Sequence, residues 1–426
     1  MYKFLFNHKK KISILIILII SAVFIDLNLF GFKDFLKKKY PNLSMIKEFK
    51  DNKYLTEHVK NDYNTEFLPN TQFEKLKLTK NKINFKSQYY ERNMKFKNSV
   101  IASPSYGSFF IEIYKEEILL ADYMGNIYKV NQKNIDKLNF KKINPIIVDS
   151  NFSSQKILDT FIYKDKIYIS SVVAEKNCKT LNISEANINL KQLNFETFYK
   201  GKECGDLLLG GKIQSYTHNN QDGIIITTHG HKYNQPDQSP QNDNSIYGKI
   251  IFFDFKNKRP IIFSKGHRVS QGLYTDGDII LQTEHGPKGG DEINKIIFNN
   301  NYGWPLVSHG EKYGLPYAQK PYYKKNHSIN NFVDPIFSFV PSIGISEIIK
   351  LPNTFSNHFQ NNFILSSLNK RHLYRIKFDP SFNRVLFFEK IFIGERVRDL
   401  KFIEKLNLLV MAFEENGEIG ILSNPD

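Results

Sequence analysis

A turn followed by a short apolar run recurs six times between Ser99 and the end of the chain. The apolar runs are residues 118–120, 167–169, 224–226, 279–281, 363–365 and 406–410. Successive runs are ~45–60 residues apart except for one step of ~85 residues, a spacing typical of four-stranded blades. The pattern predicts an all-β, six-bladed β-propeller over residues 99–426, with an insertion over one face between Tyr302 and Asn361. A β-sandwich with long loops is the alternative.

The first 98 residues have a different pattern. Lysines at positions 3 and 9–11 precede an apolar run that extends from Ile12 to Ile25 and, less regularly, to Phe32. Residues 1–32 therefore predict a signal-anchor in the bacterial inner membrane that holds the body in the periplasm. Cleavage of this segment, which would give a secreted protein, is the alternative. Residues 33–98 are polar, lysine-rich and weakly periodic, which predicts a tether with short pieces packed on the body.

Composition narrows the class of protein. The chain has 426 residues, of which 41% are hydrophobic and 14% aromatic, enough for a large core. The formal net charge is +16, but the lysines are dispersed and form no basic stripe interleaved with aromatic residues. Nucleic-acid binding is therefore not expected, whereas attraction to an anionic surface is compatible with the charge.

Candidate chemistry is concentrated in residues 266–305, which are rich in glycine, histidine, arginine and acidic residues. Short strands are predicted at residues 272–274 and 279–283, with a turn at Asp276-Gly277 between them. The glycine-rich loop after the second strand lets the backbone approach a ligand closely, and free carbonyls there suit a hard cation. A tight structural corner is the alternative.

This stretch resembles the soluble quinoprotein glucose/sorbosone and aldose sugar dehydrogenases, which are six-bladed β-propellers that bind pyrroloquinoline quinone (PQQ) and calcium. Their motif runs G-H-R-N-x-Q-G, E-H/Q-G-P-x-x-x-D-E-I-N and N-Y-G-W-P. It is matched in order at residues 266–268, 271–272, 284–287, 291–294 and 301–305. The resemblance implies oxidation of a sugar or other alcohol hydroxyl by hydride transfer to PQQ, with electrons passing to a respiratory acceptor.

The resemblance also implies a set of cofactor ligands. Arginines hold the quinone carboxylates in the family, and the matching residues are Arg268 and, in the segment G-E-R-V-R-D, Arg396 and Arg398. Strand alternation places the last two on one face, although a solvated charged strand is the alternative. Gln271 matches the motif glutamine, and a quinone-contacting lysine falls at Asn369 or Lys370.

Calcium ligands follow from the same resemblance. The carbonyls of Gly286 and Pro287 match those that hold the family's active-site calcium, which polarises the quinone. Glu292 and the carbonyl of Tyr302 match a second calcium site. A salt bridge between Glu292 and a nearby lysine is the alternative interpretation.

Two departures from the motif put catalysis in question. Leu208 stands where the family has its histidine base, and Val269 replaces the asparagine after the motif arginine. A leucine cannot accept the proton of a sugar hydroxyl. His229 and His231 are candidates for a relocated base or a metal pair, although two loop histidines with no such role are the alternative. A second hypothesis follows: a non-catalytic, calcium-binding propeller that binds a ligand or partner at the cell envelope. Nothing resembles the nucleophile of a hydrolase.

Cys178 and Cys204 are the only cysteines. An even number in an exported protein favours a disulfide, here between the second and third repeats. Two buried thiols are the alternative.

Overall fold

The computed structural model describes residues 66–67, 77–82, 108–135, 144–149, 152, 156–175, 178–205, 209–230, 238–312, 323–356, 359–415 and 417–423. The chain divides into two compact units, Met1–Asn61 and Asp62–Asp426, and all described residues belong to the second. In the described ranges no helix is both long and apolar enough to cross a membrane. The predicted signal-anchor at residues 1–32 lies outside them.

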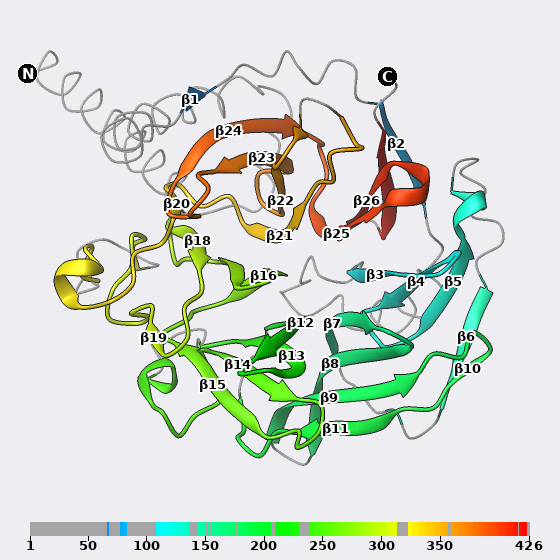
Figure 1. The fold of residues 1–426 in the computed structure, drawn as a ribbon, viewed down its shortest axis with the longest axis horizontal. Helices are drawn as coiled ribbons and strands as arrows, with labels where there is room; N and C mark the ends of the chain where they lie inside the picture. The colour runs from blue at the N-terminus through cyan, green and yellow to red at the C-terminus, as the bar shows by residue number, and fades with distance from the viewer. Residues whose placement is uncertain are drawn as a thin grey trace, which may run out of the picture. The chain divides into compact units, whose positions relative to one another are not determined.

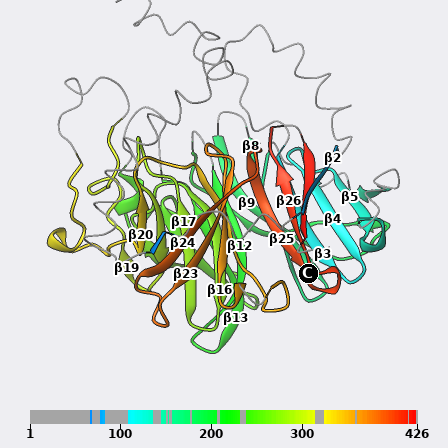
Figure 2. The same cartoon turned by 90° about the horizontal axis from the view of Figure 1, so that it is seen from above.

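The second unit is a six-bladed β-propeller. Its described strands form six sheets around one axis (Figure 1), and Figure 2 shows the same strands after a turn of 90°. Each innermost strand contacts the innermost strand of the next sheet, and the sixth contacts the first, so the ring is closed. The innermost strands are β3 (Phe109–Tyr114), β7 (Lys156–Tyr163), β12 (Gly210–His218), β16 (Ser270–Asp276), β21 (Ile345–Lys350) and β25 (Val397–Ile403).

The second strand of each of the first five blades contains one of the predicted apolar runs and that of the sixth overlaps the last run, which confirms the repeat. These strands are β4 (Glu117–Asp122), β8 (Lys166–Glu175), β13 (Gln221–Thr228), β17 (Ile279–Glu284), β22 (Phe363–Ser367) and β26 (Leu408–Phe413). Such a strand is apolar on both faces because a neighbouring blade covers each of them. Ile224, Ile225 and Ile226 illustrate this, since all three are fully buried.

The outer strands complete the blades. The third strands are β5 (Ile127–Asn131), β9 (Cys178–Asn187), β14 (Lys249–Asp254), β18 (Asp291–Lys295), β23 (His372–Phe378) and β27 (Glu418–Ser423). The fourth strands are β6 (Asn144–Val148), β11 (Glu196–Lys200), β15 (Pro260–Lys265), β20 (Phe337–Phe339), β24 (Val385–Phe392) and β2 (Lys77–Lys82). The described 3-10 helices are η3 (Gln132–Asn134), η5 (Ser239–Gln241), η7 (Ser328–Asn330) and η9 (Glu404–Leu406).

Three blades carry a fifth, parallel strand on the outer edge. β10 (Gln192–Leu193) pairs with β6, β19 (Asn300–Asn301) with β15, and β1 (Glu66–Phe67) with β24. The insertion lies between β18 and β20 and contains β19. It therefore begins before Tyr302 and ends well before Asn361, so the predicted bounds were wrong, because residues 337–339 and 345–350 form β20 and β21. The insertion therefore leaves its own blade and adds a strand to the preceding one.

The sixth blade is closed by a strand from the N-terminal side of the unit. β2 pairs antiparallel with β27, with Lys77 opposite Ser423 and Lys82 opposite Glu418. Segments from both ends of the unit thus form one sheet. Residues 33–98, expected as a tether, supply β1 and β2, while the rest of that segment lies outside the described residues.

The core lies between neighbouring blades. Between the sixth and first blades, for example, Ile403 and Val410 belong to one cluster with Ile111 and Leu120. Between the fourth and fifth blades, the rings of Phe337 and Phe388 are stacked with centroids 5.6 Å apart. Burial of such side chains contributes about 1.5–3 kcal/mol each, so the interfaces hold the ring together.

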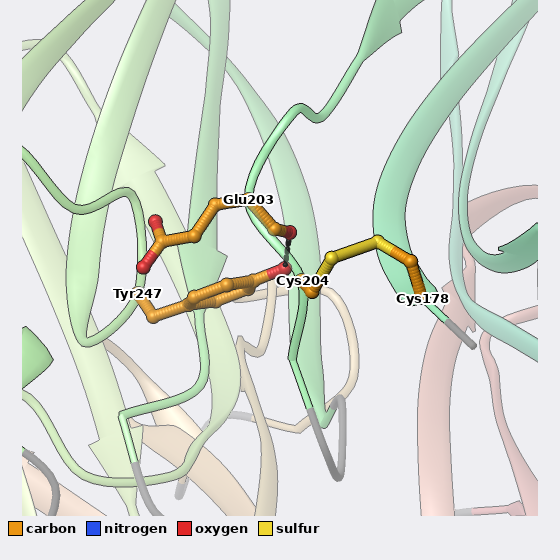
Figure 3. The surroundings of a disulfide bond; sticks show 4 residues. All are labelled: Cys178, Glu203, Cys204 and Tyr247. Carbon is orange, nitrogen blue, oxygen red and sulfur yellow. Dashed lines mark hydrogen bonds between the residues drawn. A yellow bond between two sulfur atoms is a disulfide. The ribbon is translucent and has the colours of Figure 1, made fainter.

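A disulfide joins Cys178, at the start of β9, to Cys204, in the segment that follows β11 (Figure 3). The neighbouring Glu203 accepts a 2.7 Å hydrogen bond at its backbone carbonyl from the Tyr247 hydroxyl (Figure 3). Its carboxylate accepts hydrogen bonds from the Ser245 hydroxyl and the Ile246 amide. The disulfide and these hydrogen bonds fix the end of the second blade against the third.

Replacement of both cysteines by serine is expected to lower the free energy of unfolding by about 3 kcal/mol, because the disulfide closes a loop of 26 residues in the unfolded chain. Chemical denaturation of the parent and the double variant measures the difference. The parent, isolated without reductant, should contain no alkylatable thiol. Two reactive thiols in that material would contradict the assignment.

Candidate functional site

A pocket of about 230 Å³ lies where the innermost strands begin and the second strands end. This is one end of the propeller channel, because neighbouring strands of a blade are antiparallel. The pocket is lined by Ser108, Phe110, Tyr123, Lys156, Ile157, Leu158, Leu209, Gly210, Lys212, Gln271, His285, Leu368, Arg396, Arg398 and Glu414. Of the residues predicted to bind the quinone, the structure brings Gln271, Arg396 and Arg398 together here.

Two arginines of the sixth blade share one buried carboxylate in this pocket. Arg396 Nη2 lies 2.8 Å from Glu414 Oε1, and Arg398 Nε donates a 2.6 Å hydrogen bond to Oε2. Burial opposes the charged form of Glu414, but the charges of Arg398 and Arg396 lower its pKa below the ordinary value. The carboxylate therefore stays ionised and fixes both guanidinium groups at the pocket wall.

Arg398 also reaches the fourth blade, because its Nη1 donates a 2.6 Å hydrogen bond to Gln271 Oε1. These residues are 127 positions apart in the chain. The contact confirms that the two motif segments meet at one site. Glu414 was not predicted from the sequence. It directly follows β26, the second strand of the sixth blade, just as His285 directly follows β17, the second strand of the fourth.

Among the described residues, the pocket contains a lysine from the second blade and not the lysine of the fifth blade that the motif predicts. Lys156 lines it, whereas Lys370 is not among the described lining residues. Burial and the neighbouring charge of Arg398 lower the pKa of Lys156 to about 8. Arg396 and Arg398 carry two positive charges against the single negative charge of Glu414, so this part of the wall is cationic at neutral pH.

Arg268 lies beside the glycine-rich loop. Its Nη1 donates hydrogen bonds of 2.8 Å to the carbonyls of both His285 and Gly286, and its guanidinium lies 5.2 Å from the centre of the Trp304 ring. Two carbonyls thus converge on one cationic group. The neighbouring Pro287 is buried.

Other motif residues support this loop instead of lining the pocket. His267 is fully buried, with Nε2 2.8 Å from the Ser264 hydroxyl and Nδ1 3.2 Å from Glu284 Oε2. Tyr302 stacks on the same ring at 4.7 Å. Asp291 accepts hydrogen bonds from the amide of Gly286 and, at its second oxygen, from the amides of residues 343–345. These contacts fix the loop position.

One histidine, His285, is among the described residues that line the pocket. Its Nε2 lies 2.5 Å from the backbone carbonyl of Ile345, so this nitrogen carries the proton and Nδ1 keeps the lone pair. Burial lowers the pKa of His285, and the charges of Arg398 and Arg268 act in the same direction, against the opposing charge of Asp291. The ring is therefore neutral at pH 7 and has the form of a general base.

The other candidate bases are placed differently. His229 is buried after β13 and is not among the described lining residues. Leu208 and His231 lie outside the described residues, although Leu209 and Gly210 line the pocket. Val269 is buried, and its carbonyl accepts a 2.8 Å hydrogen bond from the His285 amide.

A buried ionic cluster lies beside the pocket and links four innermost strands. Its members are Lys212, Asp159, Glu347 and Asp399. Lys212 Nζ lies 2.7 Å from Asp159 Oδ1 and 3.5 Å from Asp399 Oδ1, and it also pairs with Glu347. Burial alone would lower the pKa of Lys212, but the carboxylates of Asp159 and Glu347 raise it well above the usual value.

Lys212→Met is expected to lower the free energy of unfolding by about 3–5 kcal/mol, because it leaves three buried carboxylates without their shared cation. Chemical denaturation at neutral pH measures this loss. Lys377→Met, at an exposed position on β23, is the matched control and should change stability little. Equal stabilities of the two variants would contradict the account.

Comparison with known proteins identifies the family. The profile of the family described as Glucose / Sorbosone dehydrogenase matches residues 116–421. An uncharacterised protein of Synechocystis, slr1608, is 30% identical over 197 residues, which cover 43% of this chain and 47% of that protein. The aldose sugar dehydrogenase YliI of Escherichia coli is 27% identical over 217 residues, covering 46% and 56%. The chain thus matches about half the length of these curated relatives.

Solved structures share the fold over most of their length. A crystal structure of a glucose dehydrogenase superposes with a TM-score of 0.63 at 20% identity, covering 75% of this chain and 96% of the other. The PQQ-bound form of an aldose sugar dehydrogenase from Streptomyces coelicolor gives 0.55 at 17% identity, covering 74% and 93%. The family match runs from the first blade to the sixth, and the motif residues Gln271, His285, Arg396 and Arg398 that it contains line one pocket. The chain therefore belongs to the glucose/sorbosone dehydrogenase family.

Proposed function

We propose that the chain binds PQQ in the pocket and oxidises a hydroxyl of a sugar or related alcohol. The observation that carries this proposal is the pair Arg396 and Arg398, held at the wall of one pocket by Glu414. A small ligand with several carboxylates suits such a cationic wall, because guanidinium groups bind carboxylates with directed, charge-assisted hydrogen bonds. Bound at this wall, PQQ would supply the acceptor for the hydride equivalent, and a respiratory acceptor would then take the electrons.

The chain's own residues have separate tasks in this proposal. Arg396 and Arg398 bind ligand carboxylates, and Lys156 adds a third cationic group from the second blade. Gln271 and Glu414 keep Arg398 oriented, so little side-chain freedom remains to be lost on binding. The ligand therefore meets a guanidinium group whose orientation is already fixed by hydrogen bonds within the protein.

His285 is the candidate base of the proposed reaction. It lines the pocket and is neutral at pH 7, and its Nδ1 carries the lone pair while the Ile345 carbonyl holds the proton of Nε2. A positioned base contributes about 10²–10⁴-fold to the rate, because the substrate hydroxyl must lose its proton as the carbon is oxidised. His285 would thus serve in place of the histidine that Leu208 replaces.

Calcium would bind at the glycine-rich loop. The carbonyls of His285 and Gly286 converge on Arg268, which shows that this backbone can direct two oxygens at one positive charge. Oxygen ligands of this kind suit a hard cation. We assign Gly286 and Pro287 to this ion, whose charge would favour the anionic form of the cofactor.

A non-catalytic propeller that binds a ligand or partner is the second candidate function, and Leu208 at the family's base position favours it. Steady-state assays of the full chain with PQQ, calcium and an electron-accepting dye across a panel of aldoses and simple alcohols distinguish the two. Sugar-dependent dye reduction supports the dehydrogenase. Tight PQQ binding with no reduction by any member of the panel would favour the second candidate.

A further inference from the structure

Three metal-binding side chains meet outside the pocket. They are Glu292 on β18, His309 in the insertion after β19, and His327 immediately before η7. One potential ligand atom from each lies within 4.8 Å of the others. Glu292 and His327 are buried, whereas His309 is half-buried, which leaves a route from solvent to the cluster. Among the described residues, these histidine and carboxylate side chains bring their ligand atoms close enough together to hold one metal ion.

The insertion is folded so that its histidines reach β18. Lys288 and Glu311 exchange two backbone hydrogen bonds of 2.8 Å, which dock the segment around His309 on the glycine-rich loop. A side chain at Gly310 would place its Cβ 2.2 Å from the carbonyl oxygen of Gly289, so this close approach requires glycine. The Lys325 ammonium donates a hydrogen bond to the Gly310 carbonyl and joins the residues before His327 to the same segment.

His327 lies between two carboxylates, with one ring nitrogen toward each. Its Nδ1 lies 3.8 Å from Asp334 Oδ1, and its Nε2 lies 4.0 Å from Glu292 Oε1. At 3.8 Å the Asp334 carboxylate is too far from Nδ1 for a hydrogen bond, but it lies on the side of the ring where the outer partner of a metal-binding imidazole is found.

Glu292 lacks a strong counterpart for its charge in the described structure. The hydrogen bond that it receives, from Asn294 Nδ2, is 3.5 Å long. A bound cation would compensate the carboxylate. Contraction of the 4.0 Å contact between Glu292 and His327 to about 3.4 Å would match two ligands of a tetrahedral zinc site.

We propose that Glu292, His309 and His327 form a binding site for a divalent transition metal of the zinc class. Two imidazoles and one carboxylate suit Zn²⁺ or Co²⁺, whereas calcium prefers ligand sets made entirely of oxygen. The family resemblance assigns Glu292 and the Tyr302 carbonyl to calcium, but the side chains that meet Glu292 in this chain are two imidazoles. The metal would fasten the insertion to the fourth blade, independently of any catalysis in the pocket.

Metal titration of the full chain tests the site. The protein is stripped of metal with a chelator and titrated with Co²⁺, whose visible absorbance reports four-coordinate nitrogen and oxygen ligation, and Zn²⁺ or Ca²⁺ is then added in competition. We expect one equivalent of Co²⁺ to bind, Zn²⁺ to displace it, and an equal concentration of Ca²⁺ to leave it bound. Zn²⁺ should also raise Tm in a concentration-dependent manner.

Variants assign the ligands. His309→Gln and His327→Gln should each weaken Co²⁺ binding by on the order of 100-fold or more, and Asp334→Asn, which alters an outer partner, by about 10–100-fold. His218→Gln, at a histidine of similar burial on β12, should bind Co²⁺ as the parent does. Far-ultraviolet circular dichroism of the metal-free variants checks folding. Displacement of Co²⁺ by Ca²⁺, or parent-like Co²⁺ binding by both His309→Gln and His327→Gln, would overturn the proposal, as would a parent that binds neither Co²⁺ nor Zn²⁺.

Discussion

Replacing Arg396 and Arg398 together by glutamine is expected to weaken PQQ binding by roughly 10²–10⁴-fold, because each hydrogen bond to a charged group contributes about 1.5–3 kcal/mol. Both guanidinium groups are already fixed at the pocket wall by Glu414, so the parent loses little freedom on binding. Equilibrium titration of the full chain, followed by the absorbance of the quinone, gives the change in Kd.

The double variant leaves Glu414 buried without its cationic partners, which is costly for folding. The triple variant, with Glu414→Gln added, removes that charge and keeps the test interpretable. Arg371→Gln is the matched control, because Arg371 pairs with Glu415 and is not among the described lining residues. Unchanged Kd values in the double and triple variants would show that PQQ does not bind through the arginine pair.

His285→Gln is expected to reduce kcat for sugar oxidation by about 10²–10⁴-fold while leaving the Kd for PQQ nearly unchanged, because glutamine cannot accept the proton of the substrate hydroxyl. The dehydrogenase motif accepts either residue at this position, so folding should be retained. Dye reduction under saturating PQQ measures kcat. Equal turnover by parent and variant would exclude His285 as the base and leave His229 and His231 as candidates.

The pH profile gives an independent readout of the same residue. Only the neutral ring can act as a base, and burial, together with Arg398 and Arg268, lowers the pKa of His285 below 6.5. The rate should therefore be constant around pH 7 and fall as the pH decreases through this lowered pKa. In His285→Gln this acid limb should disappear. Leu208→His, which restores the family's base, should recover turnover in the His285→Gln background.

The fold could be predicted because its pattern is local and repeated. A second strand that is buried on both faces, such as β13, must be a continuous apolar run, and its preceding turn marks the boundary. Six such runs therefore predicted six blades. The segment that supplies the closing strand of the sixth blade could not be predicted from such a pattern. That strand, β2, is short and polar, and it pairs with β27 from the other end of the unit.

The residues of the site could be predicted only where they belong to the family motif. Arg398 and Gln271, far apart in sequence, were assigned by family resemblance and do meet. Glu414 and Lys156 carry no local signal, since a single charged residue beside a strand is usually solvated. Their role depends on which strand ends surround the channel. The same limit applies to His309 and His327, which approach Glu292 only because the insertion docks on the glycine-rich loop.

The central claim is that a sugar delivers electrons to PQQ held in the propeller pocket. An anaerobic single-turnover experiment tests it most directly: the full chain, with stoichiometric PQQ and calcium, is mixed with an aldose while the absorbance of the quinone is followed. The account predicts loss of the oxidised quinone spectrum in the parent, with much slower loss in His285→Gln. A parent that binds PQQ but keeps its oxidised spectrum with every aldose and alcohol tested would contradict it.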